Sequence, residues 1–299
     1  MANAATPAAG AVLLRDQSGF RRGMRRSRSL FKRSPLGAFG LLIILVLVIT
    51  GIFAPLIARY GVNEFAGLPS EGPSSTFFFG TDKFGQDIYS RVIHGARISL
   101  KVSFLSVLGG TVAGLVIGAI SGYRGGRLDT VIQRLVDTAI AFPALVLLLI
   151  MVRLLDPSLN NVILVIAIVI IPPNARVIRS AALVERNNDY VMAARALGAT
   201  DMRIMRRHII PNLIPLAIVL ATTLLGTAIL AEAALSFLGL GVPPPNPSWG
   251  ADISDARDTF PVNVPAAFFP GLAITLTVLG FNLLGDGLRD ILDPRLRGL

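Results

Sequence analysis

Side chains able to carry acid–base, nucleophilic or metal chemistry are few in this chain of 299 residues. Cysteine is absent, and the two histidines, His94 and His208, lie far apart in the sequence. Serine–histidine catalysis needs its groups within hydrogen-bond distance, and thiolate chemistry needs cysteine. The sequence also lacks a phosphate-binding Gly-x-x-x-x-Gly-Lys-Ser/Thr string. We therefore expect no catalytic residue, no metal site and no cofactor bound by this chain.

Three polar side chains interrupt long apolar runs: Asp137, Glu232 and Asn282. Polar groups inside a membrane are costly and often functional. Asp137 lies near the end of its run, where it can reach water or Arg134, so a structural role is favoured. Glu232 lies deeper, and a place on a polar path across the membrane is as plausible as a packing role. Asn282 is a second candidate for that path, although such amides more often link helices.

A basic segment near residue 200 has the residues of a helix–turn–helix. The stretch Met192-Ala-Ala-Arg-Ala-Leu197 consists of strong helix formers, and Gly198 follows it where a left-handed residue closes a helix. Thr200 can cap the next helix, which we expect to end before Pro211. Met202, Met205 and Ile209 would give that helix an apolar stripe. Such a helix suits either a partner's groove or the bilayer surface.

The composition places these segments in a membrane protein. Apolar residues make up 53% of the chain and charged residues 15%, against roughly 25% in soluble domains. A spanning helix needs about 20 predominantly apolar residues. We predict an all-α integral membrane protein with six spans. The predicted spans are 36–58, 99–120, 135–154, 161–178, 213–235 and 266–284.

Basic residues set the expected orientation. Eight arginines and lysines precede the first span, and a second arginine cluster lies between the fourth and fifth spans. Because basic loops stay inside and the span count is even, both termini are expected in the cytoplasm. Residues 1–35 form a basic cytoplasmic tail and 36–299 the membrane domain, with an external loop at 59–98 and a cytoplasmic loop at 179–212. Nucleic acid is disfavoured as a partner, because no aromatic residues interleave with the basic ones.

The cytoplasmic loop resembles the EAA loop of ABC importer permeases, through which a membrane subunit grips its ATPase. Ala193, Ala194, Gly198 and Pro211 match that pattern, whereas Met192 stands where a Glu is usual. Asp189 or Glu185 could replace the missing carboxylate. The resemblance implies a set of ATPase-coupling residues: Met192, Ala193, Ala194, Arg195, Gly198, Thr200, Asp201, Arg203 and Pro211.

Further motifs are similar to the C-type subunit of dipeptide and oligopeptide (Dpp/Opp) permeases. They begin at Gly80-Thr-Asp-Lys-Phe-Gly-Gln-Asp87, where Gln86 replaces a more usual Arg, and include Pro247-Ser-Trp-Gly250. The resemblance implies a type I ABC importer permease fold in the bacterial inner membrane. It also implies a homologous B-type permease, two ATPase subunits that bind ATP and Mg, and an external solute-binding protein. Peptides are the expected solute, with nickel complexes, glutathione or another small solute as alternatives.

Three residues of the external side are candidates for contacting the binding protein: Asp82, Asp87 and Trp249. The first two could equally belong to an ordinary turn, and their spacing lacks the pattern of a calcium loop. Trp249 could equally anchor the chain at the membrane interface. An ion-coupled secondary transporter is the rival class, but it predicts intramembrane charge pairs or inverted repeats that the sequence does not clearly show.

Overall fold

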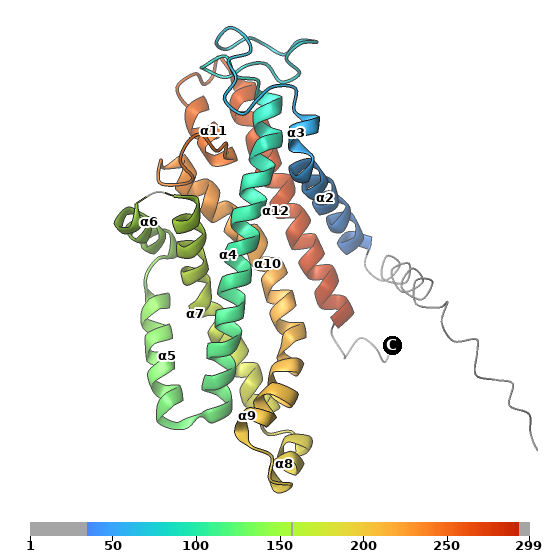
Figure 1. Cartoon of the computed structure of the whole chain (residues 1–299), viewed down its shortest axis with the longest axis vertical. Helices are drawn as coiled ribbons and strands as arrows, with labels where there is room; N and C mark the ends of the chain where they lie inside the picture. The colour runs from blue at the N-terminus through green and yellow to red at the C-terminus, as the bar shows by residue number, and fades with distance from the viewer. Residues whose placement is uncertain (1–34, 157, 293–299) are drawn as a thin grey trace, which may run out of the picture.

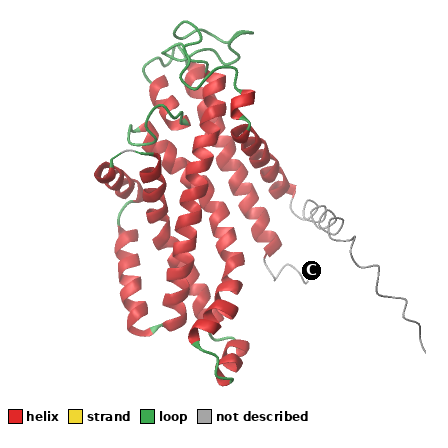
Figure 2. Ribbon diagram, viewed as in Figure 1, coloured by secondary structure: helices red, strands yellow, loops and turns green. Residues whose placement is uncertain are grey.

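The computed structural model describes residues 35–156 and 158–292 as an elongated helical bundle (Figures 1 and 2). The predicted basic tail, apart from Pro35, and the C-terminal Arg295 and Arg297 lie outside the described residues. The helices are α2 (Pro35–Ile52), α3 (Ala54–Ile57), α4 (Ile88–Arg124), α5 (Gly126–Ala141), α6 (Ala144–Leu155), α7 (Leu159–Glu185), α8 (Asp189–Ala196), α9 (Asp201–Ile204), the π-helical turn η1 (Met205–Ile209), α10 (Ile210–Phe237), α11 (Trp249–Ala256) and α12 (Val264–Leu292).

Five continuous helices among the described residues are long and apolar enough to cross a membrane. They are α2, α4, α7, the run from α9 to α10, and α12. Each contains or largely overlaps one predicted span, because a chain in lipid must satisfy its backbone hydrogen bonds within the helix. Most extend beyond the predicted limits. The largest extension at one end is in the run from α9 to α10, which begins at Asp201 rather than at residue 213.

The third predicted span is not one straight helix, which corrects the sequence interpretation. Helices α5 and α6 meet at a bend of 93° (Figure 1). Phe142 has the extended backbone (φ −80°, ψ 136°) that a following proline favours, and Pro143 cannot continue the helical hydrogen bonds. The 16 residues of α5 rise about 24 Å, less than a hydrocarbon core of about 30 Å. A sixth span therefore exists only if the bent pair is counted as one.

A glycine seam joins α4 to α7. Gly110, Gly114, Gly118 and Gly122 follow one another at intervals of four residues along α4. A Cβ on Gly118 would lie 2.5 Å from the carbonyl oxygen of Ala175. The two backbones thus approach more closely than any larger side chain permits.

Two of the three apolar clusters among the described residues hold the long helices together. The larger includes Val102, Ile166 and Ile229 and joins α4, α7 and α10 in the body of the molecule. The smaller includes Ile178, Val191 and Ile209 and lies where α7 and α10 meet the 186–200 connection. The second cluster fixes the position of the segment predicted to contact an ATPase.

Candidate functional site

The 186–200 connection has the predicted turn. Helix α8 is closed by Gly198 at φ +77°, with the N–H of Ala199 donating to the carbonyl of Ala194 at 3.0 Å. The N–H of Gly198 donates to the carbonyl of Arg195 at 3.0 Å, which completes a Schellman cap. Thr200 then caps α9 by accepting from the N–H of Arg203. The local signals for a reversal at this glycine are confirmed.

The second helix of the loop does not end before Pro211, which corrects the prediction. Helix α9 passes through the π turn η1 into α10, so one helix runs over the 37 residues Asp201–Phe237. The N–H of Ile210 donates to the carbonyl of Met205, the longer spacing of a π turn, immediately before the proline. At 1.5 Å per residue this helix is about 55 Å long. A displacement of the loop is therefore applied directly to a spanning helix.

The predicted apolar stripe is divided between two faces. Met205 and Ile209 are buried against the bundle, whereas Met202 points outward and is exposed. Met192 is also exposed, and Leu197 at the turn has 89% of its surface exposed. We call Met192, Leu197 and Met202 the loop tip. Among the other predicted coupling residues, Ala193, Arg195 and Arg203 are exposed, and Ala194 is half-buried.

A polar anchor ties the base of the loop to its flanking helices. The Glu185 carboxylate accepts a hydrogen bond from the Tyr190 hydroxyl and another, at 2.9 Å, from the Asn212 amide. Of the two carboxylates considered as replacements for the missing Glu, Glu185 is thus engaged within the loop. Asp189 is exposed in the first turn of α8 and stays the candidate.

A second anchor reaches a helix that is distant in sequence. The Tyr123 hydroxyl, in the last turn of α4, donates to Asp201 Oδ1 at 2.7 Å. Arg195 Nη2 donates to the same hydroxyl at 3.4 Å. Sequence reasoning missed Tyr123, because no local pattern places it opposite residues more than 70 positions away.

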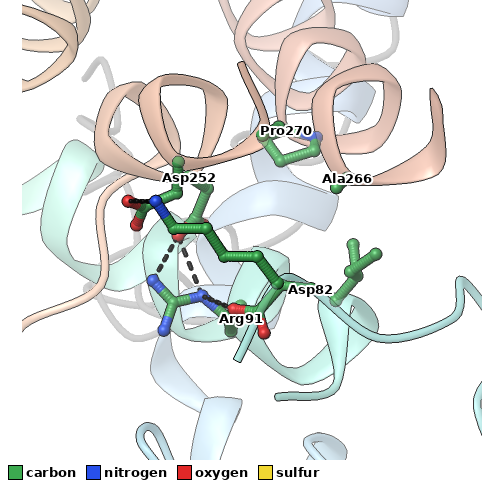
Figure 3. Close-up of a pocket in the computed structure, with 9 residues that line it drawn as sticks. Asp82, Arg91, Asp252, Ala266 and Pro270 are labelled. Atoms are coloured by element: carbon green, nitrogen blue, oxygen red, sulfur yellow. Dashed lines mark hydrogen bonds and ion pairs between the residues drawn. The ribbon is translucent and has the colours of Figure 1, made fainter. Parts of the chain in front are cut away.

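At the other end of the bundle, an ion cluster joins the 59–87 loop to α11 (Figure 3). Arg91 donates through Nε to Asp252 Oδ1 at 2.9 Å and through Nη2 to the same oxygen. Asp82 Oδ2 lies 3.8 Å from Arg91 Nε. We call this assembly, with Lys83 beside it, the external cap, after the side of the membrane on which the sequence predicts it. It brings together charges separated by more than 160 positions in the sequence.

Burial and pairing set the ionisation of the cap. Burial raises the pKa of Asp252, against the opposing attraction of Arg91. Burial likewise raises the pKa of Asp82, whose Oδ1 accepts backbone N–H bonds from Phe84 and Gln86 at 2.8 Å. At the cap surface, the ammonium of Lys83 lowers the pKa of Asp258, to which it donates at 2.7 Å.

The three residues expected to contact a binding protein are buried. Asp87 caps α4 by accepting from the Ser90 N–H at 2.9 Å, and Asp82 supports the cap as described. Trp249 is 1% exposed, donates through Nε1 to the Val92 carbonyl at 2.9 Å, and covers Gly95. A direct contact or a lipid-facing anchor would require exposed side chains. The structure instead gives these residues supporting roles within the outer end of the bundle.

The three polar residues of the predicted spans lie in three different environments. Glu232 is fully buried and accepts from Ser99 Oγ at 3.0 Å and Ser236 Oγ at 2.8 Å, so it lies inside the packing of α4 and α10 rather than on an open face. Asn282 is exposed on α12 beside Gly226 of α10. Asp137 pairs with Arg176 of α7, not with Arg134.

Comparisons with known proteins agree with this architecture. The model of the family described as binding-protein-dependent transport system inner membrane component matches residues 114–298. The model of the N-terminal transmembrane domain of oligopeptide transport permease C matches residues 24–69. Together the two models cover most of the bundle and part of the N-terminal segment.

Two relatives are similar over nearly their whole length. The dipeptide transport system permease protein DppC of Alkalihalophilus pseudofirmus is 44% identical over 269 residues, which are 89% of this chain and 88% of the relative. The glutathione transport system permease protein GsiD of Escherichia coli is 42% identical over 270 residues, or 90% and 89%.

A solved structure shares the fold. The inward-facing MetNI methionine ABC transporter contains a chain that matches with a TM-score of 0.57 at 22% identity, over 68% of this chain and 96% of that one. At that identity the match shows only the fold, whereas the family model and the relatives show the family. The chain belongs to the binding-protein-dependent transport system inner membrane components, and among them to the C-type permeases of the dipeptide and oligopeptide group.

Proposed function

We propose that this chain forms half of the translocation pathway of an ATP-driven importer in the bacterial inner membrane. A homologous B-type permease supplies the other half, two ATPase subunits dock at the cytoplasmic loop, and a binding protein delivers solute outside. Both termini are cytoplasmic and the bent pair α5–α6 counts as the third of six spans. The observation that carries this proposal is the exposed loop tip at the end of a helix continuous with α10.

The loop is suited to transmit movement rather than absorb it. Its outer face presents the apolar Met192, Leu197 and Met202 beside Arg195 and Arg203, a combination that fits a partner's groove. Its inner face is fixed by buried apolar contacts and by two polar anchors. Because the helix continues into α10, closure of the ATPases would rotate this span as a rigid body. ATP and Mg bind to the partners, and the isolated chain is expected to hydrolyse nothing.

The solute path is proposed to run along the exposed faces of α10 and α12. Asn282 of α12 is exposed beside Gly226, and Thr223 and Thr227 are exposed on the neighbouring turns of α10. Hydroxyl and amide groups on otherwise apolar helices suit a path for polar solutes or a contact with the second permease. The proposed path leaves out Glu232, because its side chain is enclosed.

A peptide is the proposed solute, because the dipeptide permease is 44% identical over 89% of this chain. Glutathione is the second candidate, since a glutathione permease is 42% identical over an equal share. Both carry amide groups and charged termini, so the same hydrogen-bonding path could serve either. Measuring which solute the cognate binding protein retains, by calorimetry with dipeptides and glutathione, decides between them.

Gly198 provides the test of the coupling loop. Its φ of +77° is strained for a β-branched residue, while a Cβ there would meet nothing within 4 Å, so Gly198→Val acts through the backbone alone. The strain of about 1–3 kcal/mol should misdirect α9 and weaken ATPase docking while insertion and abundance stay normal. Gly198→Asn should be milder, because Asn tolerates this conformation.

Gly126 is the matched control. It has φ +63° with equally open space, but it is the first residue of α5, just after the turn that joins α4 to α5. Co-purification of the ATPase pair and solute uptake are measured for each variant. We expect Gly126→Val to retain docking and Gly198→Val to lose it. Full docking and full uptake by Gly198→Val would contradict the proposal.

A further inference from the structure

The loop is held at two places that differ in kind. The Glu185–Tyr190–Asn212 anchor joins the loop to α7 and α10, the two helices that flank it in the chain. The other anchor, at Tyr123, joins it to α4, which is far away in sequence. The first keeps the loop on its own stem. The second determines whether movement of the loop is passed to another part of the bundle.

A single hydroxyl makes the second anchor. Tyr123 is 4% exposed, and its hydroxyl donates to Asp201 in α9 while accepting from Arg195 in α8. The Arg195 guanidinium also lies 5.9 Å from the centre of the tyrosine ring. Both halves of the helix–turn–helix, on either side of the Gly198 turn, therefore meet at one atom of α4.

The backbone around Tyr123 is itself fixed. Arg186, at the end of α7, donates through Nη1 to the carbonyl of Gly122 at 3.1 Å. A Cβ on Gly122 would lie 2.6 Å from the Arg179 carbonyl oxygen, so α4 and α7 are in close contact at this level. A force on the hydroxyl cannot be relieved by fraying of the last turn of α4. It acts on the whole α4–α7 pair.

Helix α4 connects the loop to the outer face of the molecule. Its 37 residues extend about 55 Å along the bundle (Figure 1). Tyr123 lies in its last turn and Arg91 in its first. Arg91 holds Asp252 of the external cap. The same rigid helix thus touches the proposed ATPase-docking loop through one hydroxyl and the cap through one guanidinium.

We propose that Tyr123 is a positioning residue that passes the displacement of the coupling loop to α4 and so to the external cap. The inference rests on the proposed function of the loop but is separate from ATPase docking. The docking face is the loop tip, whereas the Tyr123 hydroxyl faces inward. Loss of the hydroxyl should leave the ATPases bound and hydrolysing ATP. Less of the movement of the loop should then reach the external cap, so less solute should be moved per ATP hydrolysed.

The test uses the complete transporter, with both permeases, the ATPases and the binding protein, reconstituted in lipid vesicles. Tyr123→Phe keeps the buried ring and removes only the hydroxyl. The measured quantity is solute moved per ATP hydrolysed. We expect this ratio to fall roughly threefold to tenfold, which lies within the range for one residue of a coupling network, while co-purification of the ATPases is unchanged.

Three further variants separate transmission from a general packing effect. Tyr89→Phe changes the tyrosine at the outer end of α4, whose ring packs against Phe78 and Phe79, and should leave the ratio unchanged. Asp201→Ala should lower the ratio as Tyr123→Phe does. The double variant Tyr123→Phe with Asp201→Ala should show no additional loss, because the two groups share one hydrogen bond.

An unchanged ratio in Tyr123→Phe, with uptake intact, would overturn the inference and leave the proposed function standing. Loss of ATPase co-purification in Tyr123→Phe would also overturn it, because the hydroxyl would then serve docking. Additive effects in the double variant would show that Tyr123 and Asp201 act separately, and would overturn the inference that their shared hydrogen bond transmits the movement. Failure of the unaltered chain to bind the ATPases would instead contradict the proposed function.

Discussion

Gly118→Ala places the smallest possible side chain into the seam between α4 and α7. The added carbon would lie 2.5 Å from the Ala175 carbonyl oxygen and 2.9 Å from Ile178 Cβ. Gly109 on the same helix lies at the edge of the seam, where a new carbon would meet Ala167 Cβ of α7 at 3.7 Å, an ordinary contact. The two substitutions have the same chemistry and differ only in the space they meet.

The magnitude follows from these distances. Ordinary contact begins at 3.4 Å, so the shortest contact in the seam, 2.5 Å, requires the helices to separate by about 0.9 Å. The obstructing atom belongs to backbone and cannot rotate away. Overpacking of this kind costs about 1–3 kcal/mol, against which alanine's better helix propensity returns up to about 1 kcal/mol. Gly109→Ala receives that propensity without the clash.

The assay is thermal unfolding of the purified variants in one lipid nanodisc composition. We expect Gly118→Ala to unfold about 2–10 °C below Gly109→Ala, given a few degrees per kcal/mol for a chain of this size. Because unfolding of such proteins is often irreversible, equal heating rates are needed for the comparison. Equal unfolding temperatures would refute the close approach of α4 and α7.

Three further predictions concern the external cap, the orientation and the buried carboxylate. Arg91→Ala leaves Asp252 buried without its cation, at a cost of about 3–5 kcal/mol, and adding Asp252→Ala should recover part of the lost folded protein, measured by fluorescence-detected gel filtration. In the cysteine-free background, Ser74→Cys should react with an impermeant thiol reagent in intact cells and Thr200→Cys should not; the opposite pattern would invert the topology. Glu232→Gln should retain uptake because it keeps an oxygen acceptor, whereas Glu232→Leu should lower stability by about 1–3 kcal/mol; loss of uptake by a stable Gln variant would place this residue on the path.

Local signals in the sequence predicted much of the bundle and of the loop turn. Long apolar runs identify spans because lipid leaves the backbone no other partner than its own helix. Gly198 and Thr200 identify a turn because each satisfies a requirement of its immediate neighbours.

Features that depend on distant partners could not be predicted in this way. Arg91 pairs with Asp252 across 161 positions of sequence. Trp249 packs against Gly95, which precedes it by more than 150 positions. The bend at Pro143 could not be predicted from the apolar content of a stretch of about 20 residues, because a single proline changes that average very little. The continuity of α9 with α10 was missed because Pro211 is a breaker in an α-helix, whereas a π turn precedes it here.

In the proposed transporter, the loop tip meets the ATPases on the side of the membrane opposite the external cap. Leu197 at the tip and Val262 near the cap are each 89% exposed, so cysteines at both positions are equally reachable. Each single-cysteine variant is labelled with a photoactivatable maleimide and assembled with the ATPases in nanodiscs. We predict that Leu197→Cys cross-links to the ATPase on illumination and that Val262→Cys does not. A cross-link from Val262→Cys, or none from Leu197→Cys in an assembly that hydrolyses ATP, would contradict the proposed contact between the loop tip and the ATPases.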